Sequence, residues 1–204
     1  MRVDWRERYE RAAARYAVGE TRELDERQLV QLANSAWAAG LALLMAGDRE
    51  EAAEWLRRSA ERYRESWDVA GSTDAWGRPI GAMKALLIAG EDASEAADWT
   101  LGTCLDARHR DVSLSPIGRY AVAFALLVLG RDDEAAEVAA GLEDGFPSDV
   151  ADALRALAAH DAAGYRVAVA SVRRSFEREG FLEDVPVPDT ALALDALAVE
   201  RGLV

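Results

Sequence analysis

Disulfide chemistry, targeting signals and long apolar runs are missing from this chain of 204 residues. Cys104 is its one cysteine, which excludes an intramolecular disulfide and a cysteine-based zinc cluster. Residues 1–7 show no charged-then-apolar signal, and the longest apolar runs, at 41–46 and 121–129, are short of the roughly 18 residues that span a bilayer. We therefore expect a cytoplasmic protein with no membrane partner.

Strand-forming residues and prolines are also scarce. The chain has five prolines and few β-branched residues, while half of its residues are hydrophobic and many of these are alanine. These propensities favour helix nearly everywhere and make an extensive sheet improbable. The length suits one sizeable domain with a continuous core. The sequence therefore predicts a single all-α domain.

Positive charge is in short supply, because the formal net charge is -13 and the sequence pI is about 4.6. Such a surface repels phosphate backbones and anionic headgroups, so we expect no nucleic-acid partner. Lys84 is the one lysine among 24 basic residues, which together with the alanine content indicates a GC-rich genome. The acidity fits either a salt-loving prokaryotic host or electrostatic attraction of a basic partner, and the sequence leaves both open.

What the chain does contain is an internal repeat with a period of about 40 to 43 residues. An apolar stretch ending in glycine occurs at 42–47, 85–90 and 125–130, as ALLMAG, ALLIAG and ALLVLG. Each is followed by a second motif, at 51–55, 95–99 and 134–138, which reads EAAEW, EAADW and EAAEV. Two linked motifs recurring three times indicate repeated helix pairs.

The repeated motifs also predict the turn between the two helices of each pair. In each copy a helix should end at a glycine in the left-handed conformation, and a polar residue should cap the next helix. Asp48 and Asp92 are the expected caps of the second helices, each with a glutamate three residues later as in a capping box. In the third copy Arg131 occupies the cap position, so Asp132 is predicted to cap a helix that begins one residue later.

A fourth, degenerate copy aligns residues 159–161 with 46–48. His160 then stands where glycine stood, and histidine is among the side chains that tolerate the left-handed region. The apolar residues Tyr165, Val169, Val172 and Phe176 follow at repeat positions. The predicted boundaries are an N-terminal helix within 1–24, helix pairs within 25–68, 78–108, 115–143 and 148–179, and a capping helix within 188–204 after an extended break at 186–188.

Small residues in the first pair carry a family resemblance. Gly40, Gly47, Ala52 and Leu56 have the spacing of the small and apolar positions in tetratricopeptide repeats, where small residues let two helices approach closely. The region at 28–179 resembles that superfamily. The resemblance implies a right-handed stack of antiparallel helix pairs, about nine to ten helices in all, with a curved surface that binds protein or peptide.

The loop at 67–79 is the most promising candidate site, because it is long and rich in aromatic and charged residues. Trp67, Asp74, Trp76 and Arg78 are predicted to form part of a recognition surface, since aromatics and arginine dominate binding hot spots. The alternative is that the tryptophans pin an enlarged loop to the core. If the surface interpretation holds, replacing Trp76 and Arg78 together should weaken partner binding without unfolding the chain.

Two further candidates, Arg108 and His109, follow a predicted helix end. His109 could act as an acid, a base or a ligand, but the favoured interpretation is a polar residue at the helix end that interacts with the helix dipole. No second histidine is near it in the sequence, and Cys104 reads as a small buried hydrophobe. The sequence predicts no metal, no cofactor and no catalytic residue.

The expected function is therefore non-enzymatic protein–protein interaction, through aromatics and arginine on the first helix of each pair and in the loop at 67–79. One alternative is an antidote that blocks a protein toxin, because acidic helical-repeat proteins of this size resemble some bacterial immunity proteins. Another is a small-molecule pocket or a weak hydrolase between repeats, using His109 with Asp74, Asp106 or Cys104. A homodimer is compatible with each of these.

Overall fold

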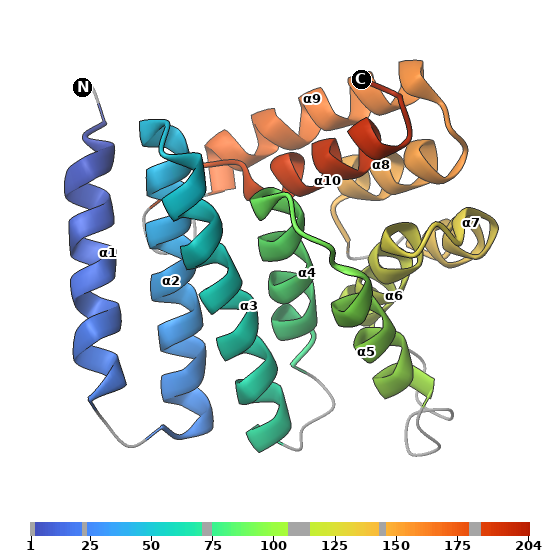
Figure 1. Ribbon diagram of the computed structural model, residues 1–204. Coiled ribbons are helices and arrows are strands. Elements are labelled where there is room, and N and C mark those ends of the chain that lie inside the picture. Colours follow the sequence, from blue (N-terminus) through green and yellow to red (C-terminus); the bar gives the residue numbers. More distant parts are fainter. Residues whose placement is uncertain (1–2, 22–23, 71–74, 106–114, 143–145, 180–184) are drawn as a thin grey trace. The chain divides into compact units, whose positions relative to one another are not determined.

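The computed structural model confirms the all-α class (Figure 1). It describes residues 3–21, 24–70, 75–105, 115–142, 146–179 and 185–204. Every regular element in these ranges is an α-helix. In chain order they are α1 (Trp5–Glu20), α2 (Glu26–Ala46), α3 (Arg49–Ala70), α4 (Gly77–Ala89), α5 (Ser94–Leu105), α6 (Pro116–Val128), α7 (Asp132–Ala140), α8 (Ser148–Ala158), α9 (Ala162–Glu179) and α10 (Asp189–Glu200).

The helices of the domain predicted at 1–204 group into two compact units. The first comprises residues Met1–Glu91 and the segment Glu179–Asp189, and the second comprises Asp92–Arg178 and Thr190–Val204. The boundary falls in the turn between α4 and α5, inside the predicted second helix pair, because α4 packs on α3 and α5 packs on α6.

In the first unit, α1 to α4 lie side by side in an up-and-down row, each packed on the next (Figure 1). The centre of the row is α2, whose buried side chains include Trp37, Leu41 and Leu43. In the second unit α6 has the same role and buries Phe124 and Leu127. Aromatics on the first helix of these pairs thus build the core, and are not presented on a surface as we had expected.

The repeated turns have one shared geometry. In five turns a backbone N–H donates to the carbonyl five residues earlier, the bond of a Schellman helix ending. These bonds run from Asp48 to Leu43, Glu91 to Leu86, Arg131 to Leu126, Asp161 to Ala156 and Leu203 to Ala198, with N···O distances of 2.9 to 3.0 Å. The residue before each donor has a positive φ, as predicted for Gly47, Gly90 and Gly130, and this is also so at Gly202.

His160 has the left-handed backbone that was predicted for the fourth copy. Its φ is 52°, the one positive value at a non-glycine position among the described residues. The predicted apolar positions after it are occupied by buried Tyr165, Val169 and Val172, while Phe176 is half-buried. The alignment with the glycine of the first copy was therefore correct.

Helix caps show where local prediction holds and where it fails. Asp4 and Asp25 cap α1 and α2 as expected, accepting from the N–H groups of Glu7 and Gln28 at 3.0 and 2.8 Å. In the third copy the prediction was wrong. Arg131 is the N-cap of α7 and Asp132 is the first helical residue, because the Asp132 carboxylate instead accepts hydrogen bonds from distant side chains.

The caps of the second and fourth copies are set by the residues just before the helix. Asp92 accepts from the N–H of Ser94 at 2.9 Å, and hydrogen bonds from Ser94 lower the pKa of this exposed carboxyl. The helix α5 accordingly begins at Ser94 with Ala93 supplying the first carbonyl, one residue later than the capping box predicted. Asp161 directly precedes α9 and is its N-cap, accepting from the N–H groups of Ala163 and Gly164.

Gly40 allows α2 and α3 to approach closely, as the repeat spacing implied. A Cβ atom there would lie 2.7 Å from Leu56 Cγ and 3.1 Å from the carbonyl oxygen of Ala52. Neither of these atoms is the free end of a flexible side chain. The position therefore cannot gain a methyl group without moving one helix away from the other.

We expect Gly40→Ala to lower the free energy of unfolding by about 1 to 2 kcal/mol, because overpacking outweighs the gain of about 0.5 to 1 kcal/mol that alanine brings to a helix. The matched control is Gly102→Ala, where an added methyl would have no described atom within 4 Å. This control should be stabilised by about 0.5 to 1 kcal/mol. Urea unfolding followed by circular dichroism measures both changes in the free energy of unfolding. If both variants were stabilised, the close approach of α2 and α3 at Gly40 would be contradicted.

The mean hydropathy of α2 corrects the expectation that no segment is apolar enough to span a bilayer. An 18-residue window in α2 reaches a mean hydropathy of 1.5, so this helix is long and apolar enough to cross a membrane by composition, although polar residues interrupt its apolar runs. Of that window, 67% is buried inside the protein. The core helix of a soluble protein has the same properties, since packing and lipid both favour apolar side chains.

Candidate functional site

Of the predicted recognition residues, Asp74, Arg108 and His109 lie outside the described residues. Trp67 and Trp76 lie together, with ring centroids 5.9 Å apart. Trp76 is only 4% exposed, so its indole is a packing element that a partner could barely reach. This is the arrangement of the alternative interpretation, in which the tryptophans attach the loop to the helices.

Arg78 is also engaged within the protein. Its guanidinium donates to the backbone carbonyl of Ser66 at 3.2 Å and forms an ion pair with Glu26, and its side chain is 11% exposed. The contacts tie the first turn of α4 to the end of α3 and the start of α2. Their geometry explains why arginine is needed here, since a planar fork of donors can serve two acceptors at once.

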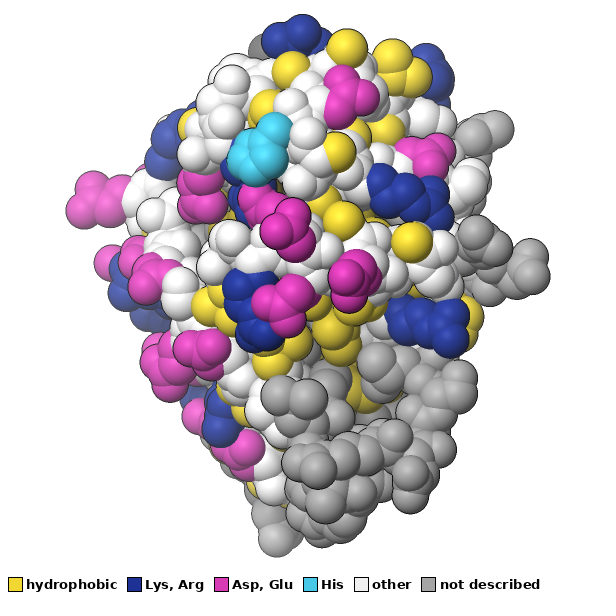
Figure 2. All heavy atoms as spheres, turned by 90° about the vertical axis from the view of Figure 1, so that its right-hand side faces the viewer, with side chains coloured by type: hydrophobic (Ala, Val, Ile, Leu, Met, Phe, Trp, Pro, Cys, Tyr) yellow, Lys and Arg dark blue, Asp and Glu magenta, His cyan; other side chains and the backbone are white. Residues whose placement is uncertain are grey.

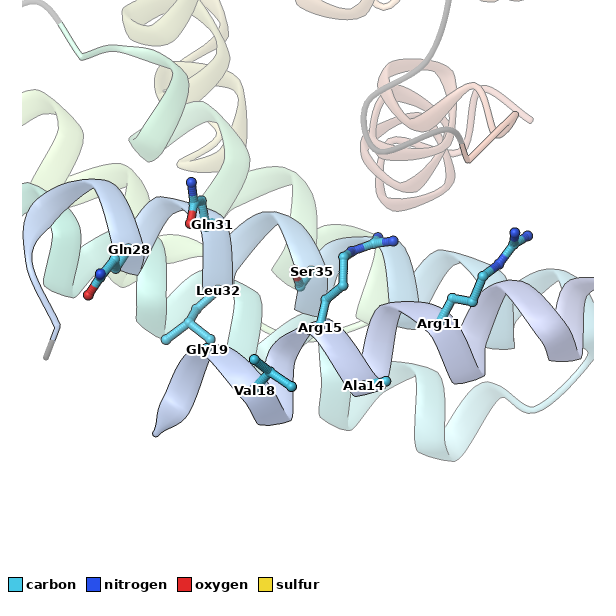
Figure 3. Close-up of a pocket in the computed structure, with 9 residues that line it drawn as sticks. All are labelled: Arg11, Ala14, Arg15, Val18, Gly19, Gln28, Gln31, Leu32 and Ser35. Atoms are coloured by element: carbon cyan, nitrogen blue, oxygen red, sulfur yellow. The ribbon is translucent and has the colours of Figure 1, made fainter. Parts of the chain in front are cut away.

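An open groove of about 690 Å³ lies between α1 and α2, within the first unit (Figure 3). Its lining is Arg11, Ala14, Arg15, Val18, Gly19, Gln28, Gln31, Leu32 and Ser35. We call it the arginine groove. Long side chains from both helices surround small ones, and it is these small residues that leave the space unfilled.

The long side chains project together. In Figure 3 Arg11 and Arg15 extend from α1, and Gln31 extends from α2, toward the same side of the helix pair. Val18 adds an apolar surface that is 56% exposed. The groove thus combines hydrogen-bond donors, two fixed positive charges and an apolar wall, a combination suited to an extended or helical peptide.

The charge of the arginine groove is opposite to that of the protein. The described residues that line it include two arginines and no carboxylate, although the chain carries 37 acidic residues and a net charge of -13. Two carboxylates near the groove pair with arginines outside its lining: Glu20 with Arg62 at 3.2 Å and Glu26 with Arg78. Glu7 reaches Arg11 at 3.8 Å, but both side chains are about 60% exposed, so this pair contributes little.

One polar atom of the groove lining has no hydrogen-bond partner. The side-chain oxygen Oε1 of Gln28 is buried and accepts no hydrogen bond among the described residues. Buried acceptors in folded proteins are nearly always satisfied by protein or by solvent. An N–H donor from a bound molecule would supply the missing partner.

A second groove, of about 800 Å³, lies between α8 and α9 in the second unit. Its charges are mixed: Asp149, Asp152 and Asp161 share the lining with Arg155 and Arg174. Four of these groups already have partners, since Asp149 accepts from Ser175, Asp152 pairs with Arg155 and Asp161 caps α9. The lining of this groove therefore carries both signs of charge, whereas the described lining of the arginine groove carries arginines and no carboxylate.

Other polar clusters have structural roles. Arg201 joins the end of α10 to α6 and α7, donating to the Leu127 carbonyl and to Asp132, both at 2.6 Å. His160 Nε2 lies 2.8 Å from the other oxygen of Asp132. These bonds hold the turn before α9 and the end of α10 against the start of α7.

The Tyr165 hydroxyl donates to Asp195 at 2.7 Å, and Arg173 pairs with the same carboxylate. Burial, together with Asp195, raises the pKa of the Tyr165 hydroxyl far above its ordinary value. The hydroxyl therefore stays protonated and acts as a hydrogen-bond donor that connects α9 to α10.

In the described ranges, no group of three or more histidine, cysteine or carboxylate side chains is placed to hold a metal ion. On the face drawn in Figure 2, basic and acidic side chains are interspersed with apolar ones, without a continuous basic field among the residues described there. No protein-family model matches the chain, and neither a curated protein nor a solved structure is significantly similar to it.

The arginine groove was not predicted from the sequence, although several of its lining residues have the spacing of one helix face. Arg11 and Arg15 stand four residues apart on one face of α1, and Gln28, Gln31 and Ser35 have the i, i+3, i+7 spacing of one face of α2. What the sequence could not give was that these two faces are neighbours.

Proposed function

We propose that this chain is a non-enzymatic protein-interaction module of the cytoplasm, related in architecture to tetratricopeptide repeats, which binds a segment of a partner protein in the arginine groove. The observation that carries the proposal is the groove itself, an open space of about 690 Å³ between two regular helices. The repeated helix pairs with a shared turn geometry support the repeat architecture.

The chemistry of the lining favours binding over catalysis. Arginine cannot exchange a proton near neutral pH, and neither glutamine nor leucine can serve as a general acid or base. The same groups are good at recognition, because guanidinium forks and amide side chains form several directed hydrogen bonds. An inhibitor of a protein toxin would be one such module, and rescue of cells from a particular toxin would identify it.

Filling the groove tests the proposal. In Ala14→Trp a large ring would occupy the floor of the groove from an exposed position on α1. We expect this variant to fold with an unchanged melting temperature and to lose at least about 90% of partner captured from lysate of the source organism, a loss of more than about 1.4 kcal/mol in affinity. Quantitative mass spectrometry of the captured proteins gives the measurement.

The matched control is Ala17→Trp. Ala17 is exposed on the same helix but does not line the groove, so the ring should leave capture unchanged. Equal capture by the wild type and both variants would place the partner surface elsewhere on the chain and refute the proposal.

A further inference from the structure

We propose that α9 of this chain pairs with α9 of a second copy, through the groove between α8 and α9. The inference goes beyond the proposed function, because it concerns the second groove and a different partner. This groove has a volume of about 800 Å³ and lies within the second unit. Its wall on α9 includes Gly164, Val167, Ser171 and Arg174, which we call the α9 face.

The α9 face has the spacing that a contact between two helices needs. Its residues follow the i, i+3, i+7, i+10 pattern of one side of a helix. Gly164 and Ser171 are small, so a second helix can approach closely. Between them Val167 is 72% exposed, the highest value for a large apolar side chain among the described residues. A partner helix on this face would remove that apolar surface from water.

Opposite charges with unused bonding capacity stand at the two ends of the α9 face. Arg174 is exposed, and no ion pair or hydrogen bond engages its guanidinium among the described residues. At the other end Asp161 caps α9 through its oxygen Oδ1. Its second oxygen, Oδ2, accepts no hydrogen bond from the part of the chain that the structure describes. This oxygen lies beside Gly164, where a Cβ atom would be 2.4 Å from it.

A two-fold axis brings these charges together. Positions 164 and 174 have the same midpoint, 169, as positions 167 and 171. An axis at this midpoint reverses the direction of the second helix and places Arg174 of each copy opposite Gly164 of the other. The guanidinium then meets Oδ2 of Asp161, and Val167 packs against Ser171. The same contacts occur twice, as in an isologous dimer, whereas a parallel pair would oppose arginine to arginine.

The net charge of the chain limits this association without preventing it. Two copies of net charge -13 repel each other at a distance. At physiological ionic strength the repulsion is largely screened beyond about 8 to 10 Å, whereas the two arginine–aspartate pairs act at contact. One helix and its neighbouring groove form an interface at the small end of the usual range. We therefore expect a reversible dimer at micromolar concentrations.

Sedimentation velocity over a micromolar concentration series tests the proposal, and wild type should show a monomer–dimer equilibrium. Val167→Glu should raise the dissociation constant at least about tenfold, because carboxylates would replace the apolar contact near the axis. The matched control is Val69→Glu, the same change of charge at a 59% exposed position on α3, which should leave the constant unchanged. Circular dichroism melts establish that each variant is folded.

A mixing experiment tests the charge pairing between copies. Asp161→Asn keeps an oxygen that can cap α9 but removes the charge, and Arg174→Gln removes its partner. Each variant alone should weaken the dimer about tenfold, because it breaks both symmetry-related pairs. A heterodimer of the two variants regains one complete pair. Native mass spectrometry of the mixture should therefore show heterodimer above the statistical half of all dimers, which a role within one copy would not produce.

Three results would overturn the inference. The first is a wild-type chain that stays monomeric throughout the series. The second is a dimer that Val167→Glu does not weaken, and the third is a heterodimer fraction at the statistical half. Ala14→Trp should leave the dimer intact, so partner capture in the arginine groove and self-association succeed or fail separately. A dimer that dissociates in Ala14→Trp would place the contact in the arginine groove and would also refute pairing through α9.

Discussion

Replacing Lys84 by methionine is expected to destabilise the protein by about 3 to 5 kcal/mol, the cost of removing one partner from a buried ion pair. Lys84 Nζ donates to Asp189 at 2.6 Å, and the two side chains are only 11% and 10% exposed. The substitution removes the ammonium that neutralises a carboxylate held away from water. It also removes a cation–π contact with Trp37, whose ring centroid lies 5.6 Å from the ammonium.

The double variant Lys84→Met/Asp189→Leu distinguishes charge burial from lost packing. Replacing both ions by apolar side chains removes the desolvation cost together with the attraction, so most of the stability should return. Urea unfolding monitored by circular dichroism measures the two free energies. If Lys84→Met lost less than about 1 kcal/mol of unfolding free energy, the ion pair would be shown to be solvated.

The ion pair between Lys84 and Asp189 joins two parts of the chain that are far apart in the sequence. Lys84 belongs to α4, and Asp189 ends the segment 179–189, which packs with the first unit although helices of the second unit lie on either side of it in the sequence. Val185 and Val187 of the same segment are buried. The ion pair therefore attaches a distant part of the chain to α4.

Trp76→Ala is the second substitution from which we expect a large loss, about 3 to 5 kcal/mol of unfolding free energy. The indole is 4% exposed and packs against Trp67, and the cavity left by alanine would lie beside the first turn of α4. Thermal and urea unfolding measure the loss. Val69→Ala, at a 59% exposed position near the same loop, is the control and should change stability by no more than about 0.5 kcal/mol.

This expectation replaces the one drawn from the sequence, that Trp76 and Arg78 could be changed together without unfolding the chain. Arg78 contributes a part-buried hydrogen bond and an ion pair, so the double variant should be less stable still. A Trp76→Ala variant of normal stability that no longer captures a partner would restore the recognition surface at 67–79.

The arginine groove could not be predicted from the sequence for a geometric reason. Helical periodicity places Arg11 and Arg15 on one face of α1, but the same pattern describes any solvated helix surface. The groove exists because that face meets the one bearing Gln28 and Gln31.

The sequence by itself determined the helices, their approximate ends and the repeated turns. A Schellman ending needs one residue of positive φ and hydrogen bonds that span six residues. Residues such as Gly47 and His160 therefore specify the helix end from the local sequence alone. Tertiary structure decided what depends on residues far apart. Asp132 did not cap its helix because His160 and Arg201 bind its carboxylate, and Trp76 became a core residue because helices cover it. Burial and charge pairing join distant segments, and sequence spacing does not specify which segments will meet.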